Sequence, residues 1–343
     1  MVAETERATP RRSRTPIEWL QYAFVRLGVL PFLLVIAIIV FGMMSDNFLS
    51  RGNLVNVARQ STYLTMVAMG QMLALLTGGF DMSVGTVLAV TSVVGALAMS
   101  TVFAASPDAV VLAISAGMAA GLGAGLLIGV ANGIGVAIFG VSPFMMTLGM
   151  ASVGFGIALF LTGGVPVYGM PDAYSKFLGF GQLLDVPTPI YVTVAFIIMV
   201  YVLLNWTRMG RYFYAIGGNP KAAHLSGINT RFNLFMAYVI CAALASCSGL
   251  MLTARIETGE ANIGATMPLE SIAACVIGGV SLRGGSGRLG NVVLGAIFIG
   301  LVQNGMNLAR IESYLQIVVV GVLLILAVIA DQLRQRFIAS VKD

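Results

Sequence analysis

Long apolar runs with very few charges dominate this chain and alternate with short polar segments. A helix rising 1.5 Å per residue crosses a hydrocarbon core of about 30 Å in roughly 20 residues. The eighth run is expected to be short or broken, because charges flank it closely. The pattern predicts ten membrane spans, Leu27–Met44, Leu54–Gly79, Val84–Thr101, Ala109–Phe139, Phe144–Leu161, Ile190–Trp206, Phe232–Ala254, Pro268–Leu282, Gly290–Ala309 and Ser313–Ala330.

Composition agrees with an all-α polytopic membrane protein. Of the 343 residues, 58% are hydrophobic and only 10% are charged, and the mean hydropathy is +0.94. A soluble domain carries about 25% charged residues. The strand alternation typical of an outer-membrane barrel is absent from the sequence. The basic leader resembles a signal peptide, but no small-residue cleavage site follows, so we expect an uncleaved first helix.

The positions of the basic residues predict how the chain lies in the membrane. With a cytoplasmic N-terminus, fourteen of the 19 Lys and Arg residues fall on the inside, as the positive-inside rule requires. They sit at span ends rather than along a stripe, which favours orientation over nucleic-acid binding. The predicted organisation is a partly disordered cytoplasmic leader (1–26), one permease domain (27–333) with an inner loop at 207–231 and a periplasmic loop at 162–189, and a cytoplasmic tail (334–343).

The stretch "TGGFDMSVG" places Asp81 in an otherwise uncharged region between Arg59 and Asp108. Either Asp81 or Ser83 caps the following helix, or Asp81 contacts a solute, because ionisable groups at membrane depth are usually functional. Both explanations stay open. Neutral amides elsewhere in the spans suit an uncharged solute. The candidate lining of a translocation pathway is Gly79, Asp81, Ser83, Asn132 and Asn304.

Glycine recurs every fourth residue in one span, at Gly117, Gly121, Gly125, Gly129 and Gly133. In lipid such a row makes a flat face on which a second helix packs closely, so we interpret it as helix packing. A faint internal repeat relates "GGFDMSVGTVLAV" to "GGVSLRGGSGRLGNVVLGA", and internal duplication is common in transporters.

Sequence patterns for catalysis, metal or cofactor binding are missing. A formal GxGxxG at Gly285, Gly287 and Gly290 lies between two spans rather than in a βαβ unit, and no phosphate-binding GxxxxGK[ST] occurs. His224 has no partner at a suggestive spacing, and we interpret it as a loop residue. The three cysteines lie in apolar spans and fit neither a disulfide framework nor a metal site. We therefore predict no catalytic residue, no metal and no cofactor bound by this chain.

The inner segment "TRMGRYFYAIGGNPKAAHLSGINTRFN" combines basic residues, a predicted turn at Gly217–Gly218 and a short helical run. Asn219 can cap that run, Pro220 can occupy its first position and Gly227 can end it. The alternatives are an amphipathic linker lying on the membrane and a docking helix for a cytosolic partner. A capped helix in the largest inner loop favours docking.

With "GGFDMSVG", "TRMGRYFYAIGGNPKAAHLSGI" and "GGVSLRGGSGRLGNVVLGA…NG" in this order, the chain resembles the permease subunits of bacterial ABC sugar importers of the ribose/galactose/xylose type. The resemblance implies an inner-membrane location, a second permease copy, a cytosolic ABC ATPase that carries ATP and Mg, and a periplasmic sugar-binding protein. It places coupling to the ATPase in residues 208–227. The candidate coupling residues are Arg208, Gly210, Arg211, Gly217, Gly218, Asn219, Ala222, Ala223 and Gly227.

The function expected on these grounds is import of a pentose or hexose by alternating access, in a subunit that is not itself an enzyme. A nucleoside, autoinducer or amino acid remains an alternative cargo. A secondary transporter driven by an ion gradient would use Asp81 instead. Few intramembrane charges argue against it, because proton and sodium relays need chains of Asp, Glu or His.

Overall fold

The computed structural model describes the backbone of residues 30–340, so the predicted leader over residues 1–26 lies outside the described residues. In the described part of the chain, a helix occupies each of the ten predicted apolar runs, and nine of these helices have 15 or more residues. The ten helices are α2 (Leu30–Met44), α3 (Arg51–Leu76), α4 (Val84–Ala105), α5 (Val110–Ala137), α6 (Pro143–Thr162), α8 (Thr188–Trp206), α11 (Thr230–Ile256), α12 (Met267–Ile277), α13 (Leu289–Leu308) and α14 (Ser313–Ser340).

Shorter elements fill two of the connections. The segment between α6 and α8 contains α7 (Asp172–Tyr174), a π-helical turn η1 (Ser175–Gly179) and a hairpin of β1 (Gln182–Leu183) and β2 (Val186–Pro187). The segment between α8 and α11 contains α9 (Arg208–Gly218) and α10 (Pro220–Leu225). The Pro- and Gly-rich outer loop is therefore more ordered than its composition predicts.

Six helices in the described part of the chain are long and apolar enough to cross a membrane: α4, α5, α6, α8, α11 and α13. Apolar stretches of 10–17 residues occur in α2, α12 and α14. The eighth predicted run is short as expected, since α12 has only 11 residues. The last helix continues to Ser340, beyond the predicted end of the final span at Ala330 and through most of the predicted tail.

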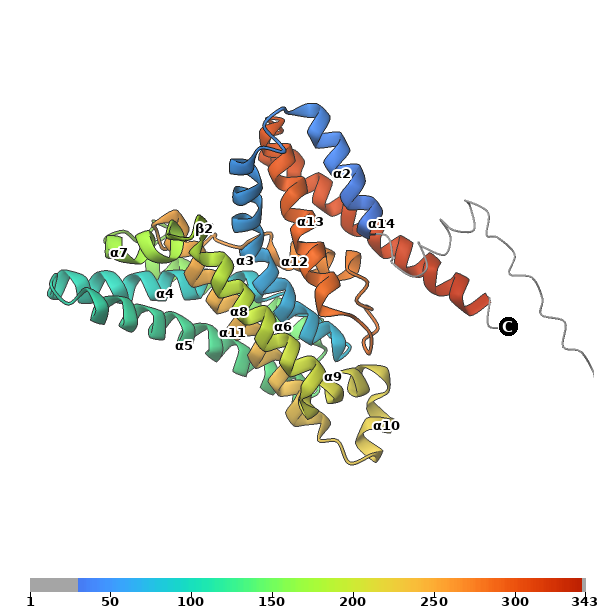
Figure 1. The fold of residues 1–343 in the computed structure, drawn as a ribbon. Helices are drawn as coiled ribbons and strands as arrows, with labels where there is room; N and C mark the ends of the chain where they lie inside the picture. The colour runs from blue at the N-terminus through green and yellow to red at the C-terminus, as the bar shows by residue number, and fades with distance from the viewer. Residues whose placement is uncertain (1–29, 341–343) are drawn as a thin grey trace, which may run out of the picture.

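Helix α3 forms the centre of the molecule. Every residue from Ser61 to Leu76 is buried, and the helix packs against α11, α13, α12 and α8. Figure 1 shows it standing between the pair α4 and α5 on one side and the group α2, α13 and α14 on the other. Because protein surrounds α3, it can carry polar side chains such as Gln71 at membrane depth without exposing them to lipid.

The outer faces of the peripheral helices are apolar and exposed. Val111 on α5 is 78% exposed, Phe160 on α6 is 87% exposed and Ile198 on α8 is 59% exposed. A soluble protein rarely exposes contiguous apolar surface on this scale. These faces fit contact with lipid, as a polytopic helical protein requires.

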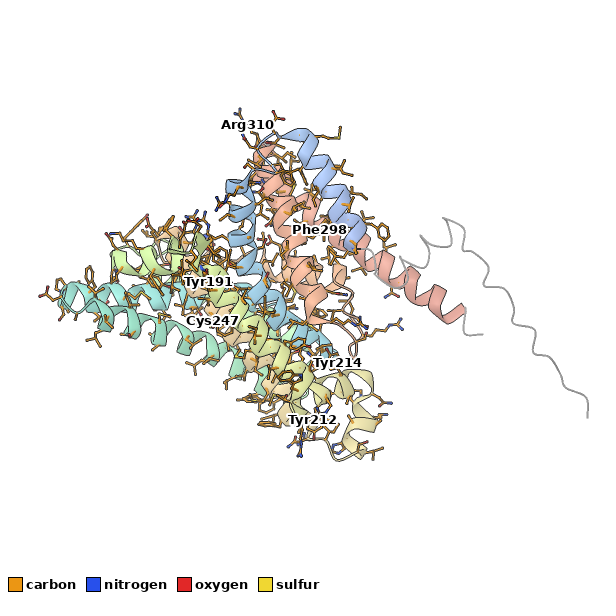
Figure 2. All side chains as sticks on the ribbon, viewed as in Figure 1. Tyr191, Tyr212, Tyr214, Cys247, Phe298 and Arg310 are labelled. Carbon is orange, nitrogen blue, oxygen red and sulfur yellow. The ribbon has the colours of Figure 1, made fainter. Side chains whose placement is uncertain are left out.

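Connections that are distant in sequence meet at the two ends of the molecule. At one end, Arg51 bonds to Asp185, 3.4 Å away, and the backbones of Val167 and Gly259 pair. At the other end, Gly285 bonds to Leu76. Figure 2 shows Arg310 and Tyr212 at opposite ends.

Candidate functional site

The turn between α3 and α4, residues 77–83, is a glycine-terminated helix end. The N–H of Gly78 donates to Leu75 O at 2.9 Å and the N–H of Gly79 donates to Ala74 O at 3.1 Å. Gly78 has φ +89°, the left-handed conformation that this type of helix end needs at its glycine. The sequence folds as the glycine pair predicts, and α4 begins again at Val84.

The same turn occurs in the second half of the chain. After α12, Gly279 has φ +80°, its N–H donates to Val276 O at 2.8 Å, and Val280 N–H donates to Cys275 O at 2.9 Å. Aligning the two "GG" pairs would match Gly78 with Gly278. The backbone conformation instead matches Gly78 with Gly279, one residue later. The faint repeat in the sequence corresponds to a repeated helix ending.

The Asp81 carboxylate lies inside the protein, next to the start of α4. Its Oδ1 accepts hydrogen bonds from the N–H of Ser83 at 2.8 Å and from the Ser83 hydroxyl at 2.6 Å, and Asp81 is fully buried. The bond to the N–H two residues on is an Asx turn. Ser83 itself makes no side-chain capping bond. Of the two candidate caps, Asp81 is thus the one that satisfies a backbone donor at the helix start.

Three other helices supply polar side chains to this place. Asn132 of α5 donates from Nδ2 to the Ser83 hydroxyl at 2.7 Å. The Gln71 amide of α3, oriented so that both its groups are satisfied, bonds to the N–H and the C=O of Asp81, each at 3.1 Å. Tyr238 of α11 brings its hydroxyl against Gly79, where a Cβ would overlap it. We call Gln71, Gly79, Asp81, Ser83, Asn132 and Tyr238 the buried polar cluster.

The buried polar cluster has spare hydrogen-bonding capacity. Among the described residues, Asp81 Oδ2, Asn132 Oδ1 and the Tyr238 hydroxyl are buried without a hydrogen bond of normal geometry, and the Cys241 thiol of α11 lies close enough to interact with the Asp81 carboxylate. An unsatisfied buried polar group costs about 1–3 kcal/mol. Such atoms can accept or donate bonds to water or to a hydroxylated solute if the bundle opens here.

Asn304, the last candidate for the pathway, lies elsewhere. Its amide and that of Asn53 bond to each other in both directions, at 2.9 and 3.0 Å. Asn53 stands at the start of α3, about 35 Å along that helix from the turn at residue 77 at 1.5 Å per residue. The structure therefore brings together Gly79, Asp81, Ser83 and Asn132 but leaves Asn304 at the opposite end.

Sequence reasoning missed Gln71 and Tyr238. Each lies in an apolar run, and its polar side chain there is the only feature of the sequence that marks it as a candidate. Gln71 bonds to Asp81 and Tyr238 lies against Gly79, both in the α3–α4 turn, so the association of Tyr238 with this turn depends on tertiary packing.

The candidate coupling segment, residues 208–227, folds into the two helices α9 and α10, and a side chain caps the start of each. Thr207 accepts from Gly210 N–H at 3.3 Å at the start of α9, and Asn219 accepts from Ala222 N–H at 3.0 Å at the start of α10. Pro220 occupies the first position of α10, as predicted. Gly227 follows with φ +81°.

One expectation for this segment is wrong. The Gly217–Gly218 pair does not form a turn, because α9 continues through both glycines. His224 lies in α10, the short helix predicted within this loop, and is exposed.

The surface of the segment is mostly exposed, including Arg208, Arg211, Gly218, Asn219, Ala222 and Gly227, whereas Gly210 and Ala223 are buried. Leu225 at the end of α10 is 87% exposed.

Tyr214 fixes α9 to the rest of the molecule. Its hydroxyl donates to Gly287 O at 3.0 Å, in the loop between α12 and α13. Burial raises the pKa of the Tyr214 hydroxyl, which keeps it protonated as a donor. Figure 2 shows Tyr214 at the end of the molecule where α9 lies.

The glycine row of α5 lies against two neighbouring helices. A Cβ on Gly121 would approach Thr91 O of α4 to 2.7 Å, and one on Gly133 would approach Phe235 of α11 to 2.7 Å. Gly117 faces Met99, Gly125 faces Ser246, and Gly129 faces Ala242. The backbone of α5 thus approaches both helices more closely than side chains would allow.

Comparison with known proteins matches the chain over most of its length. The family described as "Branched-chain amino acid transport system / permease component" matches residues 53–328. The chain is 37% identical over 305 residues to the ribose import permease protein of Escherichia coli K12, covering 88% of this chain and 92% of that protein.

Two further relatives have similar coverage. The D-allose transport system permease protein of Escherichia coli K12 is 34% identical, over 88% of this chain and 90% of that protein. The galactose/methyl galactoside import permease protein of Salmonella typhimurium is 34% identical, over 88% and 92%. No solved structure matches the chain significantly.

Both the family match and the coverage of these relatives extend over nearly all of the helical bundle. The chain therefore belongs to the family of branched-chain amino acid transport system permease components, and it is a multi-pass inner-membrane transport subunit of the ABC type rather than an enzyme.

Proposed function

We propose that this chain is the membrane-spanning subunit of an ATP-driven importer that moves a monosaccharide, a pentose or hexose, from periplasm to cytoplasm by alternating access. The observation that carries the proposal is the match to permeases named for ribose, allose and galactose, each over 88% of the chain. A cargo shared by relatives at this similarity is the simplest assignment.

The chemistry of the buried polar cluster supports an uncharged, hydroxyl-bearing cargo. It offers amide, hydroxyl and carboxylate groups, three of whose atoms lack a hydrogen bond of normal geometry within the described residues. Asp81 and Glu270 are the buried acids in the described part of the chain. An ion-coupled carrier needs connected ionisable groups, whereas Asp81 lies in the α3–α4 turn, Glu270 lies in α12, and no hydrogen bond joins them within the described residues. An amino acid, as in the family description, a nucleoside or an autoinducer remains the alternative cargo.

We place both termini in the cytoplasm and take all ten helices of the predicted apolar runs as spans. The predicted inner connections meet one another, because Gly285 of the α12–α13 loop bonds to Leu76 at the end of α3 and Tyr214 of α9 bonds to Gly287. The predicted outer connections also meet, through the pairs Arg51–Asp185 and Val167–Gly259. This grouping supports an alternating path for the chain across the membrane.

Two copies of the chain would form the pathway between them, with a cytosolic ABC ATPase bound beneath. ATP and Mg would reside on the ATPase, and a periplasmic binding protein would deliver the sugar. The capped helix α10 supports docking at residues 208–227, because it presents the apolar side chain of Leu225 to solvent.

Uptake in cells tests both cargo and energy source. A strain lacking the gene is complemented with it and given radiolabelled ribose, allose, galactose or leucine. We expect uptake of at least one of the sugars, lost on ATP depletion but retained when an ionophore collapses the proton gradient. Uptake of leucine alone would assign the alternative cargo, and loss with the ionophore at normal ATP would favour the ion-coupled carrier.

A further inference from the structure

Three backbone segments meet where α9 ends. They are the last turn of α9, the α3–α4 turn (77–83), and the α12–α13 loop (278–288). Gly285 N–H of the loop donates to Leu76 O at the end of α3, at 3.0 Å. The Tyr214 hydroxyl of α9 donates to Gly287 O of the same loop, at 3.0 Å. The loop is thus bonded to both of the other segments.

Glycines make this meeting possible. A Cβ on Gly284 would lie 2.9 Å from the Cα of Gly78 and 3.0 Å from the Cα of Gly217. A Cβ on Gly285 would lie 2.7 Å from the Gly218 nitrogen, and one on Gly217 would overlap Leu76 O. These neighbours are backbone atoms, which cannot swing away as the end of a flexible side chain can.

Backbone conformation adds a second requirement at three of these positions. Gly78 and Gly284 both have φ +89°, and Gly285 has φ +71°. Residues with a Cβ rarely adopt this left-handed region. At Gly284 and Gly285 space and conformation both call for glycine, whereas Gly78 needs glycine for its conformation and Gly217 for space. We call Gly78, Gly217, Gly284 and Gly285 the glycine junction.

The position of the junction relates it to transport. One of its segments, the last turn of α9, lies within the candidate coupling segment, and the other two are the connections that contain the repeated helix endings at Gly78 and Gly279. The α3–α4 turn leads directly to Asp81 and the buried polar cluster. The α12–α13 loop leads into α13, which packs along α3. At Gly217, Gly284 and Gly285 the backbone of α9 meets the backbones of both connections directly.

From this arrangement we infer that the glycine junction transmits movement of α9 to both helix breaks at once, with Gly217 and Tyr214 as its positioning residues. Closely packed backbone transmits displacement rather than absorbing it. A push on α9 from beneath then displaces the turn that carries Asp81 and the loop that carries Gly287 together. This inference rests on the proposed function, since it requires a partner that pushes on α9.

The test uses the permease purified in complex with its ATP-binding subunit. Met82, half-buried in the α3–α4 turn, is replaced by cysteine, and the rate of maleimide labelling is measured with and without ATP plus vanadate. The native cysteines are buried or half-buried, and the protein without the new cysteine supplies their background. Met82→Cys without a further substitution is the parent of the variants below. The reporter is combined with Gly217→Ala, with Tyr214→Phe, or with Gly290→Ala. Gly290 is the matched control, because a Cβ there meets nothing within 4 Å.

We expect ATP plus vanadate to change the labelling rate at least threefold in the parent and in Gly290→Ala. In Gly217→Ala the change should fall below 1.5-fold while ATP hydrolysis stays within twofold of the parent. Tyr214→Phe keeps the ring and loses only the bond to Gly287, so it should assemble normally and lose about half of the change. An unaltered nucleotide response in Tyr214→Phe and in any assembled Gly217→Ala complex would overturn the inference, as would a parent whose Met82 position does not respond.

The readout does not depend on the cargo. A nucleotide-dependent labelling change of the expected pattern, together with no sugar uptake by the parent, would uphold the junction and refute the monosaccharide assignment.

Discussion

Removing the Asp81 carboxylate should destabilise the protein by an amount set by the two bonds it accepts. Those bonds come from Ser83 N–H at 2.8 Å and Ser83 Oγ at 2.6 Å, inside a fully buried site. In Asp81→Ala both donors lose their acceptor, and a buried unsatisfied donor costs about 1–3 kcal/mol. Removing a desolvated carboxylate offsets part of that cost. We expect the free energy of unfolding to fall by about 3 kcal/mol, a value between the cost of one and the cost of two unsatisfied donors.

Asp81→Asn separates the hydrogen bonds from the charge. Its amide oxygen can accept both bonds from Ser83 as the carboxylate does, while the charge is removed. The loss should be under about 1 kcal/mol, because both Ser83 donors stay satisfied. A milder effect in Asn than in Ala is therefore the signature of the structural role.

Thermal unfolding of the detergent-solubilised variants measures this difference. At about 2.1 cal/mol/K per residue, a loss of 3 kcal/mol lowers the Tm of a chain of this length by about 4 °C. Sugar uptake is measured on the same variants. Equal losses of uptake in Ala and Asn at unchanged Tm would refute the reasoning, since they would show that the charge itself is needed. An unchanged Tm in Asp81→Ala would show that the carboxylate does not hold the helix start.

Three further predictions concern other parts of the fold. Gly125→Ala places a Cβ against Ser246 Oγ and 2.6 Å from Thr91 Oγ1, so it should lower the Tm by several degrees. In the control Gly123→Ala the new Cβ meets nothing within 4 Å, so the Tm should stay unchanged or rise slightly. Equal Tm values in the two variants would contradict close packing of α5. Leu225→Asp should weaken capture of the ATPase at least tenfold in a pull-down without changing membrane insertion, because Leu225 is 87% exposed and packs on nothing that insertion needs; undiminished capture would remove it from the docking surface. A double-mutant cycle of Asn53→Ala and Asn304→Ala should give a coupling energy of about 1 kcal/mol for the paired amides, measured by thermal unfolding, and additive effects would mean that the pair contributes nothing to stability.

The sequence predicts the helices well because each is set by a local property. A run of apolar residues long enough to bury its backbone in lipid must be helical, and the charges that flank such runs mark their ends. Asn219, Pro220 and Gly227 similarly determine α10 through capping, and the crowding of charges around the eighth run accounts for the shortness of α12. The order found at residues 172–187 has no such local signal.

The sequence predicts only part of the site, because the site depends on which helices pack against one another. Asp81 is conspicuous as a charge in an apolar region, and Ser83 lies within reach along the chain. Gln71 and Tyr238 reach the same place from α3 and α11, which no local pattern predicts. Asn304 looks equivalent to Asn132 in the sequence, yet it pairs with Asn53 at the far end of α3.

The close contact of α9 with two distant turns is likewise a tertiary feature. Gly217 was expected to make a turn, because a glycine pair commonly does so. In the fold its function is to leave room for Leu76 and Gly285. A glycine in a helix costs about 1 kcal/mol relative to alanine, and close backbone packing is what compensates for it.

We expect this chain to form a membrane pathway that is powered by a separate nucleotide-hydrolysing subunit. This is measured most directly as accumulation of radiolabelled ribose in proteoliposomes that hold the permease alone or the permease with its ATPase and binding protein, each with ATP on the side of the candidate coupling segment. We expect uphill accumulation only in the complete system. Uphill accumulation by the permease alone would contradict this division of roles.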